Sequence, residues 1–306
     1  MLKIGSLCTG YGGLDMAVEA FFNAETVWTC EFDKHASQII ELRMNKVNHG
    51  DLKKTDWTQV EPIDILTAGY PCQPFSHAGA RKGADDERHL WPYIKEIIRT
   101  LRPQFVILEN VRGHFGLGFR EVLADLASIR YDTTWRLVRA SDVGAPHRRE
   151  RLFILAYSNR VPHNDARRAH RGVSSPSSSQ FNGTDWQEHR CGLENAVNSS
   201  CQCITHNRTV PELGQRFTSR RDMHLQEVPP PLDQGKLNAK FVEYMMGLPD
   251  GWVTDVGLSR AQQLKILGNG VVPQQAYYAL ELLWDTYTQH LSTATPNLCT
   301  THAVSQ

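Results

Sequence analysis

The amino-acid sequence predicts an α/β fold with a doubly wound, mostly parallel sheet. The first 157 residues alternate short apolar runs with longer segments whose apolar residues recur at helical spacing, which is the pattern of βαβ units. A glycine-rich turn at residues 8–15 follows the first apolar run and opens a helical segment. A cysteine and a glutamate each follow a later apolar run, at the sheet edge where ligands bind in such folds. These observations predict a functional site at the carboxyl ends of the strands.

The expected elements follow one another in a regular order. The strands are short runs rich in apolar residues, and we expect them at Lys3–Leu7, Thr26–Cys30, Ile63–Ala68, Gln104–Leu108, Thr134–Val138 and Leu152–Ala156. The helices between them place apolar residues on one face, and we expect them at Leu14–Phe22, Lys34–Asn45, Trp91–Leu101 and Phe119–Ile129. After a long interruption the patterning resumes with an amphipathic helix at Phe241–Met246, a turn at 247–252 and an apolar helix from Gln274 to Tyr287.

Composition separates the chain into a patterned part and two polar parts. Residues 1–157 and 236–287 carry the regular patterning. Residues 158–235 are polar, with a serine run around Pro176 and little periodicity, which indicates either a linker or a small irregular domain. Residues 288–306 are also polar, and we expect a disordered tail there.

The overall charge and cysteine content exclude several classes of protein. The formal net charge is zero, which argues against a protein that coats DNA without specificity, although arginines cluster locally, as at 148–151 and 216–221. Seven scattered cysteines do not form a disulfide framework. The N-terminus does not resemble a secretory signal, and no apolar run reaches the roughly 20 residues that span a bilayer. We therefore expect a cytoplasmic protein that does not act at a membrane.

The glycine-rich turn and two acidic residues predict a nucleoside site. Its Gly-x-Gly-Gly spacing differs from the dinucleotide fingerprint and no P-loop follows, so an ordinary tight turn remains the alternative. Glu31 lies at the end of the second strand, where a carboxylate commonly accepts hydrogen bonds from ribose hydroxyls. Asp51 follows another short segment and could accept from an adenine amino group. This combination favours an adenosine with a non-phosphate tail, such as S-adenosylmethionine.

The residues with the strongest chemical signal are Cys72 and Glu109. Cys72 lies between prolines directly after a predicted strand, and Glu109 closes the next apolar run, so both are expected at the same sheet edge. A thiolate beside a carboxyl group suits attack on an electron-poor ring whose nitrogen is held by the acid. A buried structural cysteine is the alternative for Cys72 taken alone.

A third block, residues 144–154, contains two alternating arginines. Arg149 and Arg151 precede or enter a predicted strand, so we expect both on one face. Guanidinium groups there suit phosphates or an oxygen on which negative charge develops. An edge strand with solubilising arginines is the alternative reading.

Together these blocks resemble the DNA (cytosine-5)-methyltransferase family. The resemblance rests on Pro71-Cys72-Gln73, on Glu109-Asn110-Val111, on the arginine block and on two late segments, 241–249 and 265–273. It covers about 1–157 and 236–285, in the family's order. Two places depart from the family pattern: Ser6-Leu7-Cys8 stands where the family more often shows an aromatic residue before the glycines, and His147 stands in a glutamine position.

The resemblance implies a fold, a cofactor and a set of site residues. It implies the Rossmann-like fold of S-adenosylmethionine-dependent methyltransferases, with 1–157 and 236–287 as the catalytic and cofactor-binding domain and 158–235 as a small target-recognition domain. The implied catalytic residues are Cys72, Glu109, Arg149 and Arg151. The implied cofactor-binding residues are Gly10, Tyr11, Gly12, Gly13, Leu14, Glu31, Phe32, Asp51, Leu52, Pro71, Asn269 and Val271. The expected DNA-binding residues are Gln73, Ser76, Arg81, Arg148, Arg220 and Arg221.

The resemblance also implies a reaction and its partners. Cys72 would add to C6 of a cytosine that is flipped out of double-stranded DNA, and a methyl group would pass from S-adenosylmethionine to C5. We expect a monomer in a prokaryotic or phage-infected cell, and a cognate restriction endonuclease is left open as a partner. A tRNA cytosine-5 methyltransferase of the same fold and a catalytically silent DNA-binding protein are the alternatives. No metal is expected, because the spacings of His189, Cys191, Cys201, Cys203 and His206 are not those of paired zinc ligands.

Overall fold

A computed structural model describes residues 1–71, 90–159 and 228–293. Its centre is a seven-stranded sheet in the order β3-β2-β1-β4-β5-β7-β6. The strands are β1 (Leu2–Leu7), β2 (Ala24–Cys30), β3 (Val47–Asn48), β4 (Ile65–Gly69), β5 (Phe105–Val111), β6 (Tyr131–Arg139) and β7 (Glu150–Ser158). The five neighbouring strands β3, β2, β1, β4 and β5 pair in parallel, whereas β7 runs antiparallel between β5 and β6. The predicted doubly wound, mostly parallel sheet is therefore confirmed.

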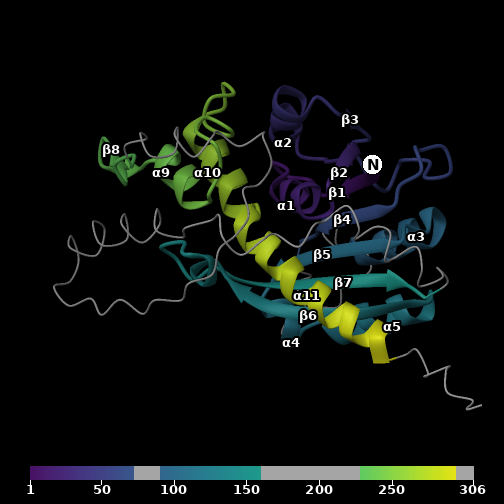
Figure 1. Cartoon of the computed structure of the whole chain (residues 1–306). Coiled ribbons are helices and arrows are strands. Elements are labelled where there is room, and N and C mark those ends of the chain that lie inside the picture. The colour runs from purple at the N-terminus through teal and green to yellow at the C-terminus, as the bar shows by residue number, and fades with distance from the viewer. Residues whose placement is uncertain (72–89, 160–227, 294–306) are drawn as a thin grey trace, which may run out of the picture.

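Helices cover both faces of this sheet. On one face, α1 (Gly13–Phe22) and α11 (Pro273–Thr293) bury an aromatic cluster against β5, and Figure 1 shows α11 running diagonally across the sheet. Phe22, Phe105, Trp284 and Tyr287 meet there in edge-to-face, tilted and stacked contacts. On the other face, α3 (Trp91–Leu101) and α5 (Phe119–Ser128) cover a second apolar core. The sheet is thus buried on both sides, as a parallel sheet requires.

Several boundaries differ from the sequence prediction. The helix expected over Lys34–Asn45 consists of α2 (Lys34–Ile39) followed by a π-helical turn (Ile40–Met44). Helix α11 continues to Thr293, and Leu291 is buried in the core, so the expectation of a disordered tail beginning at 288 is wrong for 288–293. The apolar positions of this helix repeat into its last turn, and their burial outweighs the polar composition.

Some short elements were not predicted at all. Helix α10 (Arg260–Asn269) buries only Ile266 and Leu267, so the sequence lacks the apolar stripe that marks a surface helix. The other unpredicted elements are β3, a short helix α4 (Gly113–Gly116), a 3-10 turn (Ala140–Val143) and a two-stranded hairpin of β8 (Leu232–Asp233) and β9 (Lys236–Leu237). Among the described helices, none combines the length and the hydrophobicity that crossing a membrane needs.

The segment after residue 236 packs back onto the first residues of the chain. Helix α9 (Ala239–Met245) and the loop that follows it share an apolar core with Tyr11, Met16 and Ile39. Arg43 donates hydrogen bonds to the carbonyls of Gly251, Trp252 and Asp255, and the Trp252 indole donates to the carbonyl of Tyr11. Residues distant in sequence therefore form one unit beside the strand ends.

Glu243 organises the loop of this returning segment. It is 1% exposed, and its carboxylate accepts hydrogen bonds from the amides of Gly251, Val253 and Thr254 and from the Thr254 hydroxyl. Glu243→Gln should lower the free energy of unfolding by about 1–3 kcal/mol, because an amide cannot accept all four bonds. Denaturant unfolding measures this loss. The matched change Glu121→Gln, at an exposed position of α5, should alter stability by less than about 0.5 kcal/mol. Equal effects of the two changes would contradict this role of Glu243.

Candidate active site

A cavity of about 800 Å³ opens at the carboxyl ends of the parallel strands. Because β1, β2, β4 and β5 run in the same direction, the residues that follow them meet at one edge of the sheet. The wall of the cavity is completed by the end of α10 and the residues after it. Residues from both ends of the chain therefore share one cavity.

The pairing of β4 with β5 brings the two predicted reactive segments together. The register sets Gly69 opposite Glu109, and a Cβ at Gly69 would lie 3.5 Å from Oε2 of Glu109. Tyr70 and Pro71 continue along the cavity wall, and the Asn110 amide donates a hydrogen bond of 3.0 Å to the carbonyl of Tyr70. The chain thus reaches Pro71 in the same cavity as Glu109, and Cys72, the next residue, lies outside the described residues.

Glu109 and Arg151 form a buried ion pair. Nε of Arg151 lies 3.0 Å from Oε1 of Glu109, and the two side chains are 15% and 8% exposed. Burial raises the pKa of Glu109 to about 7, and the charges of Arg151 and Arg149 only partly offset this effect. The carboxyl group can therefore be protonated or ionised near neutral pH, which suits a group that exchanges a proton with a bound ring.

Arg149 does not share the position of Arg151. It lies one residue before β7 at a positive φ of 30°, outside the alternation of the strand, and it does not line the cavity. Its Nη2 donates hydrogen bonds of 2.8 and 2.5 Å to the carbonyls of Gly268 and Gly270. The structure therefore contradicts the expectation of two arginines on one face, and it gives Arg149 the role of fixing the segment after α10. Arg148 is exposed, as a DNA contact requires.

Glu31 lies in the cavity wall at the end of β2. Its Oε2 accepts a hydrogen bond from the amide of Gly10, and its Oε1 accepts one from the amide of Asp33, each at 2.8 Å. Gly10 has a φ of +60°, which a residue with a side chain adopts only rarely. Burial raises the pKa of Glu31, and the hydrogen bonds from the two amides oppose that shift. The carboxylate is thus held rigidly, with lone pairs left for a ligand.

The remaining predicted cofactor residues divide into two groups. Those that line the cavity are Gly10, Gly13, Leu14, Phe32, Asp51, Leu52, Pro71, Asn269 and Val271. Among them, the Phe32 side chain is largely exposed, at 77%. The Asp51 carboxylate is held locally, because its Oδ1 accepts a hydrogen bond from the amide of Lys53. Tyr11 and Gly12 do not line the cavity, so their assignment as direct cofactor contacts is not supported by the structure.

Tyr11 instead fixes the closing segment of the cavity. Its side chain is fully buried, and its hydroxyl donates a hydrogen bond of 2.6 Å to the carbonyl of Val271. The ring lies so close to Gly270 that a Cβ there would approach it to 1.8 Å. Only glycine fits at position 270, which explains the glycine in the late motif.

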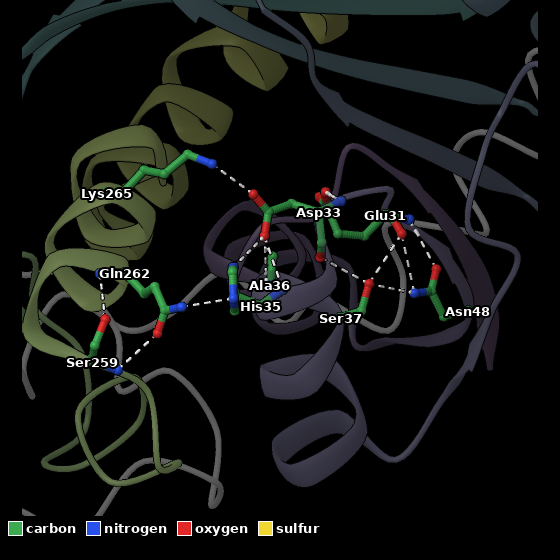
Figure 2. Close-up of polar contacts among 9 residues, drawn as sticks. All are labelled: Glu31, Asp33, His35, Ala36, Ser37, Asn48, Ser259, Gln262 and Lys265. Carbon is green, nitrogen blue, oxygen red and sulfur yellow. Dashed lines mark hydrogen bonds and ion pairs between the residues drawn. The ribbon is translucent and has the colours of Figure 1, made fainter.

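Helix α10 is fastened to α2 at the rim of the cavity, as Figure 2 shows. Nζ of Lys265 lies 2.8 Å from Oδ2 of Asp33, and the Gln262 amide contacts Nε2 of His35 at 2.7 Å. Burial alone would raise the pKa of Asp33, but the hydrogen bonds from Lys265 and from the first amides of α2 lower it to about 2. These contacts hold the start of the 268–271 segment against the first strands.

Two buried or charged residues of the cavity were missed by the sequence analysis. Asp15 is 1% exposed and accepts hydrogen bonds from the hydroxyls of Ser6 and Thr67, and burial raises its pKa to about 6. Lys265 lies at the rim. Asp15 directly follows the glycine-rich turn, which was the available signal. The predicted DNA contacts Gln73, Ser76, Arg81, Arg220 and Arg221 lie outside the described residues, as do His189, Cys191, Cys201, Cys203 and His206.

Comparison with known proteins gives the family. The family model described as C-5 cytosine-specific DNA methylase matches residues 2–199. The chain is 35% identical over 167 residues to the type II methyltransferase M.NgoBI of Neisseria gonorrhoeae, a match that covers 53% of this chain and 52% of the relative. It is 32% identical over 163 residues to the type II methyltransferase M.HhaI of Haemophilus parahaemolyticus, with 52% of this chain and 50% of the relative covered. The chain thus spans about half the length of these curated relatives.

Solved structures share the fold. The Dnmt2 methyltransferase of S. pombe superposes with a TM-score of 0.59 at 18% identity, covering 94% of this chain and 99% of that one. A putative DNA modification methyltransferase encoded within a prophage (E. coli) superposes with a TM-score of 0.58 at 20% identity, covering 94% and 100%. The match of the family model covers well over half of the sequence, including the glycine-rich turn, Cys72, Glu109 and Arg151. The chain therefore belongs to the C-5 cytosine-specific DNA methylase family.

Proposed function

We propose that this protein transfers a methyl group from S-adenosylmethionine to C5 of a cytosine in a specific sequence of double-stranded DNA. The observation that carries the proposal is the position of Glu109. Its buried carboxyl group, with a pKa near 7, lies opposite the strand end that leads to Cys72 and in the same cavity as Glu31. Membership of the family and the names of the type II relatives support the choice of DNA as the polymer.

The cavity fits S-adenosylmethionine by its donors and acceptors. Glu31 offers carboxylate lone pairs at the end of β2, as a ribose requires, and Asp51 offers an acceptor on the next segment of the wall. Gly10 brings the backbone close without a side chain. Bound S-adenosylmethionine would supply an electrophilic methyl group.

The residues of the chain would activate the cytosine in two ways. The Cys72 thiolate forms a bond from Sγ to C6, and the electron pair of the C5–C6 double bond moves through the ring toward N3. Protonated Glu109 donates a hydrogen bond to N3 and stabilises the charge that develops there. C5 then becomes nucleophilic and would take the methyl group, whose bond to the sulfonium sulfur breaks with the electron pair left on sulfur. Loss of the C5 proton to solvent returns an electron pair to the ring and breaks the Sγ–C6 bond, which restores the Cys72 thiolate.

Arg151 would orient the acid and neutralise charge on the ring. Its guanidinium holds Oε1 of Glu109 and lines the cavity, so a further N–H group is available for the cytosine O2. Because C6 is attacked from above the ring, the base must leave the helical stack. Closure of the cavity by the segment after α10 would keep water away from this step.

The remaining assignments concern recognition and context. We propose that residues 158–235 read the DNA sequence, with Arg220 and Arg221 among the contacts, and that Gln73, Ser76, Arg81 and Arg148 contact DNA near the flipped base. Further proposals are that the protein acts as a monomer in the cytoplasm of a prokaryotic or phage-infected cell and that a cognate restriction endonuclease is its partner. The designation of the relatives as type II methyltransferases supports this context.

Covalent trapping tests the proposed nucleophile. DNA that carries 5-fluorocytosine in the target site should form a stable adduct, because fluorine cannot leave C5 as a proton does. Mass spectrometry of the digested protein should place the adduct on the peptide that contains Cys72. Cys72→Ala should abolish both adduct and methyl transfer while it leaves S-adenosylmethionine binding unchanged.

The same measurement separates the alternatives. An adduct on another cysteine would exclude Cys72 as the nucleophile. Methylation of tRNA transcripts, with none of duplex DNA, would instead favour the tRNA methyltransferase, and DNA binding without any transfer would favour a catalytically silent protein. Sequencing of methylated cytosines in DNA from cells that express the protein would identify the target site.

The cofactor assignment predicts a loss of affinity when Glu31 is removed. Glu31→Ala should weaken S-adenosylmethionine binding by about 1–3 kcal/mol, because a hydrogen-bonded acceptor is lost and the amides of Gly10 and Asp33 lose their partner. Titration calorimetry measures this change. Glu96→Ala, which removes an exposed carboxylate on α3, is the control and should bind as the wild type does. Unchanged affinity in Glu31→Ala, or tighter binding of ATP or NAD than of S-adenosylmethionine, would refute the assignment.

The raised pKa of Glu109 predicts the pH dependence of the chemical step. A carboxyl group with a pKa of about 7 is protonated below that pH and loses its proton above it, so the single-turnover rate should fall as the pH rises through 7. Glu109→Gln should lower the rate and remove this alkaline limb, as measured from about pH 6 to about pH 9. Glu61→Gln, at an exposed ion pair with Lys3, should keep the wild-type profile. An unchanged alkaline limb in Glu109→Gln would assign that titration to another group.

A further inference from the structure

A buried hydrogen-bonded pair joins the residue that follows β4 to helix α4. The hydroxyl of Tyr70 and Nε2 of His114 are 3.0 Å apart, and the side chains are 3% and 1% exposed. The two rings also meet edge to face, with their centroids 5.6 Å apart, and the Trp91 ring packs against Tyr70 as well. Tyr70 is two residues before Cys72, whereas His114 lies in α4, five residues after Glu109.

Tyr70 is held at both ends by the segment that begins with Glu109. Its carbonyl accepts a hydrogen bond from the Asn110 amide, and its hydroxyl bonds to His114. Asn110 also accepts a hydrogen bond from the amide of Val111, which fixes its own side chain. The position of the chain entering Cys72 is therefore set relative to the strand that carries Glu109.

Packing alone does not account for a histidine at this place. Within the described part of the chain, Nδ1 of His114 has no hydrogen-bond partner although it is buried. Burial also lowers the pKa of His114, and the backbone of Leu117 only partly opposes this effect, so the ring is neutral near pH 7. Its Nε2 is the nitrogen that bonds to Tyr70. A leucine would fill the same space without a buried unpaired nitrogen. The hydrogen bond to Tyr70 is the feature that the histidine supplies and an apolar side chain does not.

We infer that His114 is a positioning residue for the methyl-transfer reaction, acting through the Tyr70 hydroxyl to fix Tyr70 and Pro71, the residues that lead into Cys72, relative to Glu109. The inference rests on the proposed function, because it assumes that Cys72 attacks a base held by Glu109. Small displacements of a nucleophile have large effects on rate: about 1 Å can cost on the order of a hundredfold. A hydrogen bond that acts on the second residue before the nucleophile is suited to set that distance.

The test compares Tyr70→Phe, His114→Leu and the double variant in the full chain. Each should lower the single-turnover rate of methyl transfer, and the rate of adduct formation with 5-fluorocytosine DNA, by about ten- to a hundredfold. Affinity for S-adenosylmethionine and the melting temperature of His114→Leu should stay near those of the wild type. Because both single changes break the same bond, the double variant should be no slower than the slower single variant.

Two further variants separate positioning from general packing. His114→Gln retains a nitrogen able to reach the Tyr70 hydroxyl and should recover most of the rate. Tyr131→Phe removes another buried tyrosine hydroxyl, at the start of β6, which donates a hydrogen bond to the carbonyl of Pro103. This variant should leave the rate unchanged. Wild-type rates in Tyr70→Phe and His114→Leu, or losses that multiply in the double variant, would overturn the inference and leave the proposed function intact. A wild-type protein that methylates neither DNA nor RNA would overturn both.

Discussion

The parallel pairing of β4 with β5 is the constraint on which the site depends. Its register sets Gly69, the last residue of β4, opposite Glu109, so the chain leaves β4 beside the Glu109 carboxyl group. Because both strands are buried on two faces, a slip of one residue would turn apolar side chains such as Leu66 and Val106 to the wrong core. The packing of the sheet therefore sets where the chain leaves β4 relative to Glu109, and the hydrogen bond from Asn110 to Tyr70 secures this position locally.

A second layer of organisation comes from the end of the chain. The segment after α10 closes the cavity because side chains from earlier in the chain pack against it and bond to its carbonyls. Tyr11 packs on Gly270 and bonds to the carbonyl of Val271, and Arg149 binds the carbonyls of Gly268 and Gly270. These residues stabilise the site without lining it, so changes there would disturb cofactor binding through the backbone.

Burial and pairing divide the carboxyl groups around the cavity into two classes. Asp15 and Glu109 are buried and Glu31 is half-buried, and desolvation raises the pKa of each. Asp33, at the rim, receives the Lys265 ammonium and the first amides of α2, and its pKa falls to about 2. Asp33 is thus a permanent charge that fastens α10, whereas Glu109 gains and loses its proton near neutral pH. One cavity therefore holds a structural anion and a titrating acid.

The sequence by itself determined the order of the main strands and helices, the sheet edge that holds the site, and the proximity of Glu109 to the end of β4. These features follow from local patterning and from the rule that parallel strands end together. Only the tertiary structure decided the roles of Arg149 and Tyr11. Arg149 leaves the strand alternation through a positive φ, and the Tyr11 ring turns into the core to meet Gly270.

Helix α10 could not be predicted from the sequence either, because its position depends on contacts with Asp33 and His35, more than 200 residues earlier, and not on an apolar stripe of its own. Contacts between distant segments leave no periodic signal in the sequence, so the closing wall of the cavity emerges only when the chain is folded.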